Sequence, residues 1–128
     1  MKNAKILVIE DKNSATRSIC PKIKDLGHNI LAIESHRIKA IKDSIELKPD
    51  LILINITGST NRTASIIREC FDGPIIYMTD HLDSQLLEKV QLVPPVYILR
   101  KEFSDIELKN TVETALYNNF KLKDSTKI

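Results

Sequence analysis

Four short runs of apolar residues, none interrupted by a charged residue, constrain this chain more than any other feature. They cover residues 6–9, 51–56, 75–78 and 96–99, and a weaker fifth run covers 29–33. Short uninterrupted runs are typical of strands buried on both faces, as in a parallel sheet between two layers of helices. We therefore expect five strands in one parallel sheet.

Between these runs, apolar residues recur at spacings of three and four, which is the period of an α-helix. These stripes are Ala15, Ile19, Ile23 and Leu26; Ile38, Ile41 and Ile45; Leu82, Leu86 and Val90; and Leu108, Val112, Ala115 and Leu116. A further helix is predicted over residues 64–70, because Gly-Pro at 73–74 is a stop signal. Each stripe is expected to cover one face of the sheet, which gives five strand–helix units. Ser104 and Glu107 form a capping-box pattern that predicts where the last helix begins.

The size and composition predict one globular domain. The chain has 128 residues, of which 42% are hydrophobic and 28% charged, and these values exclude a disordered or fibrous chain. We expect the domain to span residues 1–120 and residues 121–128 to be a polar tail or the start of a linker. The 19 basic and 17 acidic residues are scattered and give a net charge of +2, which offers no basis for nucleic-acid binding.

Cysteine usage and hydropathy indicate the compartment. Cys20 and Cys70 lie in separate helical segments without metal-binding spacing, so we expect both thiols to be buried in a reducing cytosol. No apolar run approaches the roughly 20 residues that cross a bilayer, so we expect no membrane partner. His28, His36 and His81 lack ligand spacing and are expected to be solvated or to cap helices.

Polar residues follow most of the predicted strands. In an open parallel sheet the carboxyl ends of the strands meet at one edge, where ligands bind. Two adjacent carboxylates there suit Mg²⁺, although an acidic pair is also common in the first turn of a helix. A hydroxyl and an ammonium nearby would suit phosphoryl oxygens. The residues at this edge are Glu10 and Asp11, Asn55 and Thr57, Thr79, and Arg100 with Lys101.

Four ordered motifs resemble the receiver domain of two-component response regulators. They are KILVIED at residues 5–11, PDLILINI at 49–56, PIIYMT at 74–79 and YILRKEF at 97–103. The resemblance covers residues 5 to about 117. It implies an α/β flavodoxin-like (CheY-like) fold, a doubly wound three-layer sandwich with strand order 2-1-3-4-5 and five helices.

The resemblance also assigns roles to the residues at the sheet edge. In that family an aspartate at the end of the third strand accepts a phosphoryl group, and this position is Asn55. The family's Mg²⁺ ligands correspond to Glu10, Asp11 and the backbone carbonyl of Thr57. The switch hydroxyl corresponds to Thr79, the switch aromatic to Tyr97 and the conserved lysine to Lys101.

Several departures from the family pattern predict that the site is degenerate. The amide of Asn55 is neutral and is not a nucleophile for phosphorus, and its lack of charge should weaken Mg²⁺ binding. The loop after the third strand is about three residues short of the family pattern. Residues 100–103 carry one extra residue and lack the usual proline, and Asp80 would repel an incoming anion.

We therefore expect a receiver-like domain in phosphorelay signalling that is not phosphorylated, is not an enzyme and binds Mg²⁺ weakly or not at all. Its expected partner is a protein such as a sensor histidine kinase, a PAS domain or an output domain. A homodimer through the fourth helix, fifth strand and fifth helix is also expected. Two alternatives stay open: a functional receiver, or a metal- or anion-sensing domain that uses Glu10, Asp11, Asp80 and Lys101.

Overall fold

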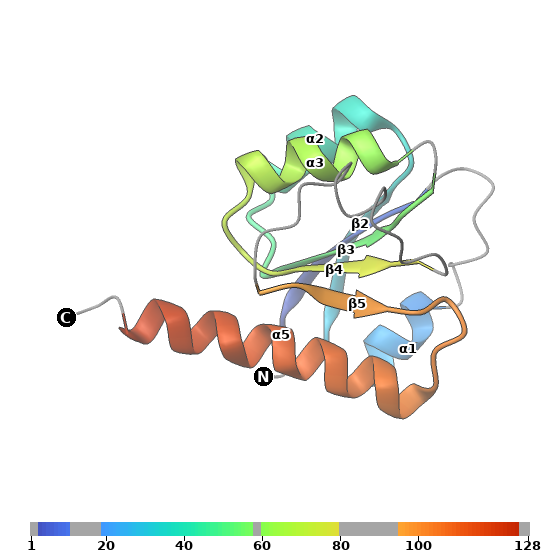
Figure 1. Ribbon diagram of the computed structural model, residues 1–128, viewed down its shortest axis with the longest axis vertical. Helices are drawn as coiled ribbons and strands as arrows, with labels where there is room; N and C mark the ends of the chain where they lie inside the picture. Colours follow the sequence, from blue (N-terminus) through green and yellow to red (C-terminus); the bar gives the residue numbers. More distant parts are fainter. Residues whose placement is uncertain (1–2, 11–18, 58–59, 80–94, 126–128) are drawn as a thin grey trace.

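The computed structural model describes residues 3–10, 19–57, 60–79 and 95–125 of the chain, and it describes side chains as far as residue 120. Strands and helices alternate as far as residue 78, and a further strand and helix follow residues 80–94 (Figure 1). The strands are β1 (Lys5–Ile9), β2 (Asn29–Glu34), β3 (Leu51–Asn55), β4 (Ile75–Met78) and β5 (Tyr97–Leu99). The helices are α1 (Ile19–Asp25), α2 (Arg37–Glu46), α3 (Asn61–Cys70) and α5 (Asp105–Ser125).

The five strands form one parallel sheet in the order β2-β1-β3-β4-β5, which confirms the predicted order. The central strands are fully buried: every residue of β3 and β4 is inaccessible or nearly so. Their register pairs Ile9 with Ile54 and Asn55 with Met78, so the carboxyl ends of β1, β3 and β4 are level with one another. The carboxyl ends of these strands, where the sequence predicts the functional site, therefore form one continuous edge of the sheet.

Helices cover both faces of the sheet, with α2 and α3 on one side and α1 and α5 on the other (Figure 1). Alternate residues of β1 enter separate cores: Val8 packs on the α1 and α5 side, and Leu7 on the α2 and α3 side. The described residues contain four helices, not the predicted five. The missing one, predicted from Leu82, Leu86 and Val90, lies among residues 80–94, which are outside the described residues.

The last helix begins where the capping pattern predicts. The Ser104 hydroxyl accepts a hydrogen bond of 3.1 Å from the backbone N–H of Glu107, and the Leu108 N–H donates to the Ser104 carbonyl. Helix α5 then runs to Ser125 and extends beyond the sheet (Figure 1). Its backbone thus continues into residues 121–125, which we assigned to a tail, and the domain boundary at residue 120 stays a prediction.

The predicted orientation of α2 was wrong for two of its three isoleucines. Ile38 is 72% and Ile45 53% exposed, whereas Ile41 is partly buried against the core. Helix α2 instead buries Ala40, Asp43 and Ser44. Small residues let the helix approach β2 closely, and Asp43 packs toward Glu34 of that strand, whose side chain is also buried. A close-packed polar contact therefore occupies the position that we assigned to the isoleucines.

The cysteine prediction was half right. Cys20 is buried and Cys70 is exposed, and both are free thiols. Cys70 is the last residue of α3 and lies beyond the residues that this helix buries, which are Thr63, Ala64 and Ile67. Within the described part of the chain, none of the helices has the length and apolar character that a membrane span requires.

Candidate functional site

Most of the predicted site residues that the structure describes lie along the carboxyl edge of the sheet. Glu10 follows β1 and its N–H donates to the Glu34 carbonyl at 2.9 Å, which continues the strand pairing by one residue. In the same way the Thr79 N–H donates to the Leu99 carbonyl at 3.1 Å. Since Ile9 pairs with Ile54, Glu10 and Asn55 leave neighbouring strands side by side. Asp11 and Asp80 lie outside the described residues.

Asn55 is the last residue of β3, and its side chain is almost fully enclosed, with 2% exposure. The neighbouring polar residues are also buried: Glu10 is 4% and Thr79 5% exposed. A carboxamide holds no negative charge at neutral pH, so burial there avoids the large cost of enclosing an ionised group. The end of β3 therefore buries a neutral group beside other buried polar residues.

The loop after β3 is closed by Thr60, which the sequence analysis did not single out. Its hydroxyl donates a hydrogen bond of 2.6 Å to the backbone carbonyl of Asn55 and accepts one of 2.8 Å from the N–H of Thr57. Thr60 occupies the N-cap position of α3 but makes no side-chain hydrogen bond to that helix. A threonine before a helix normally signals a cap, whereas here the hydroxyl faces back into the loop.

The backbone carbonyl of Thr57 is used by the start of α3. It accepts hydrogen bonds of 3.2 Å from the N–H groups of Thr60 and Asn61. This is the carbonyl that the family resemblance assigns to Mg²⁺, and two donors already take up its lone pairs. Among the described residues, no group of three or more metal-binding side chains is present. Of the predicted Mg²⁺ ligands, the described residues hold one carboxylate, Glu10, and the Thr57 carbonyl, which already accepts two hydrogen bonds, while Asp11 lies outside them.

Glu10 also influences a thiol. Burial raises the pKa of Cys20, and the nearby negative charge of Glu10 raises it further. Both effects favour the protonated thiol, which is a poor nucleophile. Cys20 is therefore a packing residue of the core that contains Val8 and Ile19, and it is not a candidate for nucleophilic chemistry.

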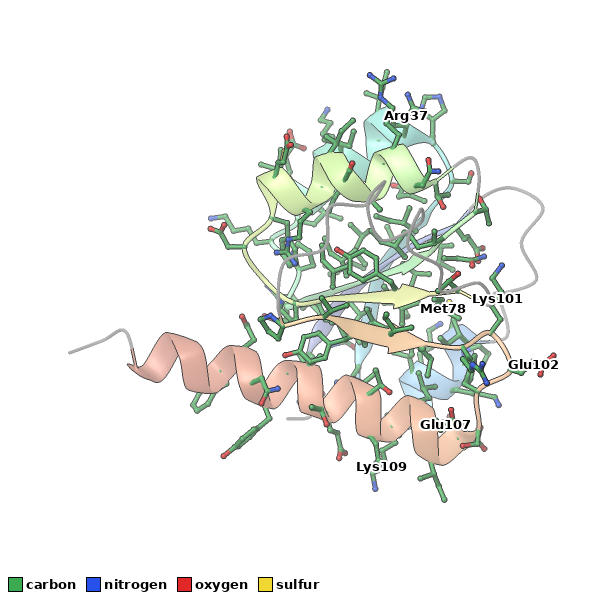
Figure 2. The ribbon with its side chains drawn as sticks, viewed as in Figure 1. Arg37, Met78, Lys101, Glu102, Glu107 and Lys109 are labelled. Carbon is green, nitrogen blue, oxygen red and sulfur yellow. The ribbon has the colours of Figure 1, made fainter. Side chains whose placement is uncertain are left out.

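Tyr97 and Lys101 lie on and after the edge strand β5. The Tyr97 ring is partly buried against the core, and its hydroxyl accepts a hydrogen bond of 3.2 Å from the Asn118 side chain of α5. Lys101 follows β5 in a turn, two residues after Leu99, which pairs with Met78. Figure 2 accordingly draws Lys101 close to the carboxyl end of β4. The structure thus brings Lys101 to the predicted edge and links Tyr97 to α5.

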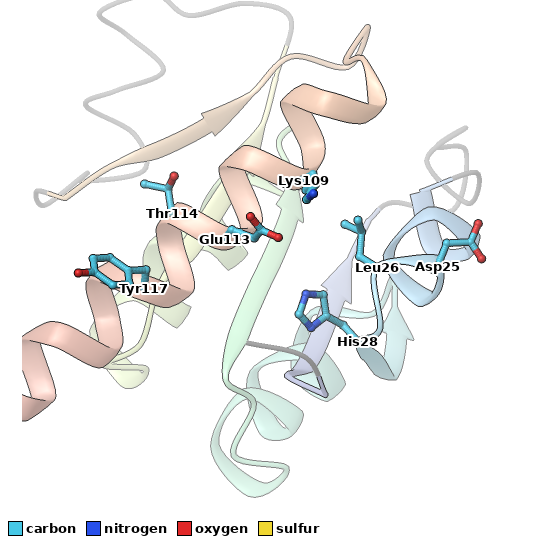
Figure 3. Close-up of a pocket in the computed structure, with 7 residues that line it drawn as sticks. All are labelled: Asp25, Leu26, His28, Lys109, Glu113, Thr114 and Tyr117. Carbon is cyan, nitrogen blue, oxygen red and sulfur yellow. The ribbon is translucent and has the colours of Figure 1, made fainter.

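A groove of about 720 Å³ lies away from this edge, between α1 and α5 (Figure 3). Our prediction that His28 is solvated or caps a helix was wrong, because this residue is 5% exposed. Its Nδ1 accepts a hydrogen bond of 3.2 Å from the N–H of Ala4, which places the ring proton on Nε2. Burial lowers the pKa of His28 and favours this neutral form. His36, by contrast, is exposed as predicted.

Comparisons with known proteins place the fold. No protein-family model matches the chain. The chain is 27% identical over 117 residues to the phyllosphere-induced regulator PhyR of Methylorubrum extorquens, an alignment that covers 88% of this chain and 43% of PhyR. The chain thus spans less than half the length of the curated relative that it matches.

Solved structures are similar along nearly the whole chain. The signal receiver domain of a modulated diguanylate cyclase from Desulfovibrio desulfuricans superimposes with a TM-score of 0.80 at 23% identity, covering 95% of this chain and 99% of that one. The fold is that of a receiver domain. The chemotaxis protein CheY4 of Vibrio cholerae gives a TM-score of 0.74 at 18% identity, over 89% of this chain and 99% of that one.

The anti-anti-sigma factor PhyR of Bartonella quintana is similar too, with a TM-score of 0.75 at 20% identity, and covers 98% of this chain and 52% of that one. These likenesses confirm the CheY-like fold and sheet order that the sequence motifs predict. They leave the chemistry of position 55, and the roles of Glu10, Thr57, Thr79, Tyr97 and Lys101, as predictions.

Proposed function

We propose that this receiver-like domain takes part in two-component signalling as a protein-interaction module and is not phosphorylated at position 55. The observation that carries the proposal is the buried carboxamide of Asn55 at the end of β3. Phosphoryl transfer to this edge requires an anionic oxygen as the nucleophile, and an amide oxygen has no such charge. No acyl phosphate forms at Asn55.

The loop geometry supports the same proposal. Thr60 ties the Asn55 carbonyl to the Thr57 N–H, and the Thr57 carbonyl serves the first turn of α3. The described residues on either side of positions 58–59 are therefore joined by their own hydrogen bonds, without a cation between them. This arrangement favours the interaction role over the alternative of a metal- or anion-sensing pocket.

The relatives suggest the kind of process. PhyR is named as a regulator, a response regulator and an anti-anti-sigma factor. We infer a protein partner for this chain, such as a sensor histidine kinase, a PAS domain or an output domain, in the cytoplasm. A homodimer through β5, α5 and the helix predicted over 82–90 is a further proposal, and Tyr117 and Phe120 of α5 are exposed enough to contribute.

The test is treatment of the purified chain with acetyl phosphate and Mg²⁺, followed by intact mass spectrometry. We expect no phosphoryl adduct on the natural chain, and its appearance on any carboxylate of the sheet edge would overturn the proposal. Titration calorimetry with Mg²⁺ separates the sensing alternative, which requires tight binding. The Asn55→Asp variant is the matched control, because phosphorylation of that variant would show that the rest of the pocket still works.

A further inference from the structure

Helix α2 exposes two isoleucines, Ile38 and Ile45, on the face that it turns away from the sheet. Ile38, Ile41 and Ile45 are spaced by three and four residues and share one side of the helix. Ile38 is 72% and Ile45 53% exposed, whereas Ile41 is partly buried. The opposite side of α2 faces the sheet through Ala40, Asp43 and Ser44. An amphipathic helix that turns its apolar side to solvent contradicts the usual pattern, and such conflicts are expected at binding surfaces.

Exposed basic residues border this isoleucine face. Arg37, Lys39 and Lys42 are exposed on the same helix, and the one exposed acid on it is Glu46. Figure 2 shows Arg37 at the start of α2, pointing away from the sheet. Lys39 pairs with Glu34 at 3.3 Å but is itself 65% exposed, so its charge still reaches the surface. The face is therefore apolar along its centre and positive along its borders.

A hollow of about 270 Å³ adjoins the first turn of α2. Ser35 and His36 line it from the β2–α2 connection, Ile38 from the isoleucine face, and Thr60 and Thr63 from α3. The first helical hydrogen bond of α2 runs from the Ala40 N–H to the His36 carbonyl, so the N–H groups of residues 37–39 precede it. His36 makes no side-chain cap, and the first turn contains no acidic residue. The start of α2 thus lacks the negative charge that helix N-termini favour.

We propose that the α2 face, defined by Ile38, Ile41 and Ile45 with Arg37, Lys39 and Lys42, binds an acidic amphipathic helix of a partner protein. The partner's apolar side covers the isoleucines, its carboxylates pair with the basic border, and one carboxylate enters the hollow at the start of α2. This inference rests on the proposal that the domain acts through binding, and it names the chemistry of one partner surface. A flat anionic membrane would meet the charges and isoleucines but would not fill the hollow between α2 and α3.

The test uses the full chain and a synthetic peptide of about 18 residues, roughly five turns of helix, with leucine on one side and glutamate elsewhere. A peptide with lysine in place of every glutamate is the matched control. We expect the glutamate peptide to bind, to shift the methyl NMR signals of Ile38 and Ile45, and to bind more weakly as salt rises. The lysine peptide should not bind.

Variants of the chain locate the contact. Replacing Ile38 and Ile45 together by serine should weaken binding of the glutamate peptide by about tenfold or more. The Ile106→Ser variant is the control, because Ile106 is 71% exposed but lies on α5, on the other side of the sheet. Should the double serine variant fail to fold, the Arg37→Gln, Lys42→Gln variant tests the basic border instead, with weaker binding and less dependence on salt expected.

Several results would overturn the inference. Equal binding of both peptides, signal shifts confined to α5, or binding that is unaffected by both double variants would each do so. Binding through Ile38 to phosphatidylcholine–phosphatidylglycerol vesicles but not to the glutamate peptide would assign the face to a membrane. A dimer of this chain that Ile38→Ser dissociates would assign it to a second copy. A phosphoryl adduct on the natural chain would overturn the proposed function and leave the peptide result standing.

Discussion

The Thr60 hydroxyl, just before α3, binds two backbone groups at the end of β3: it donates a hydrogen bond of 2.6 Å to the Asn55 carbonyl and accepts one of 2.8 Å from the Thr57 N–H. Thr60 is 5% exposed, so solvent has little access to these groups. A buried backbone group that loses its partner costs more than the bond itself contributes. One side chain therefore fixes the loop next to the position where receivers accept phosphate.

Replacing Thr60 by valine should destabilise the chain. Valine keeps the shape of threonine but removes the hydrogen bonds of the Thr60 hydroxyl to the Asn55 carbonyl and the Thr57 N–H, at a cost of about 1 to 3 kcal/mol in unfolding free energy. Urea unfolding measures it. The control is Thr111→Val on α5, where the hydroxyl hydrogen bond to the Glu107 carbonyl is exposed and its loss should cost much less. Equal losses at the two positions would contradict the role given to Thr60.

Replacing Asn55 by aspartate should make stability depend on pH. Burial and the neighbouring Glu10 carboxylate disfavour a second charge, so the introduced group should have a raised pKa and the variant should lose roughly 2 to 4 kcal/mol near neutral pH. Because the folded state then binds the proton more tightly than the unfolded state, stability should recover as the pH falls toward about 4.

Urea unfolding of the Asn55→Asp variant at about pH 7.5 and about pH 4.5 measures this difference. Asn110→Asp on the exposed side of α5 is the control and should change stability by less than about 0.5 kcal/mol at either pH. An Asn55→Asp variant that is as stable as the natural chain, and that Mg²⁺ stabilises further, would indicate an intact metal site.

The sheet could be predicted from the sequence because the central strands β1, β3 and β4 are buried on both faces and therefore consist of uninterrupted apolar runs. The order β2-β1-β3-β4-β5 came from the receiver resemblance, and the start of α5 came from Ser104 and Glu107, whose interaction is local. Local capping signals and uninterrupted apolar runs can be recognised without knowledge of the tertiary contacts.

The orientation of α2 and the roles of Thr60 and His28 could not be predicted in this way. Periodicity shows which residues share a helix face, but it does not show which face packs against the sheet. In α2 the face with the small residues Ala40 and Ser44 is the buried one. Thr60 carries an ordinary capping signal, and only the fold shows that its hydroxyl faces the loop. His28 accepts from Ala4, 24 positions away, a contact that no sequence spacing indicates.

Replacing Glu34 by glutamine should stabilise the chain near neutral pH. Burial raises the pKa of Glu34, its contact with Asp43 adds to the rise, and the Lys39 ammonium partly offsets both. The folded state therefore holds the proton more tightly, and the natural chain loses stability as pH rises through the interval between the unfolded and the folded pKa. The gain from Glu34→Gln should be larger at about pH 7 than at about pH 4, as measured by urea unfolding. A variant less stable than the natural chain at neutral pH would mean that the Lys39 pair outweighs burial.

Replacing His28 by asparagine should remove a source of acid sensitivity. The neutral ring accepts a hydrogen bond from the Ala4 N–H through Nδ1, and burial lowers its pKa, although Glu113 across the groove acts in the opposite direction (Figure 3). As pH falls below about 6.5 the unfolded state gains a proton that the folded state resists, so the natural chain loses stability there. Asparagine offers an oxygen acceptor to Ala4 but does not titrate.

The measurement is the change in unfolding free energy between about pH 7.5 and about pH 5.5 for each chain. We expect a smaller decrease for His28→Asn than for the natural chain. His28→Ala separates the two effects, because it removes the acceptor as well and should be less stable than His28→Asn at both pH values. Identical decreases for the natural chain and His28→Asn would mean that the buried imidazole titrates as it does in the unfolded chain, and that the groove between α1 and α5 exerts no control over its protonation.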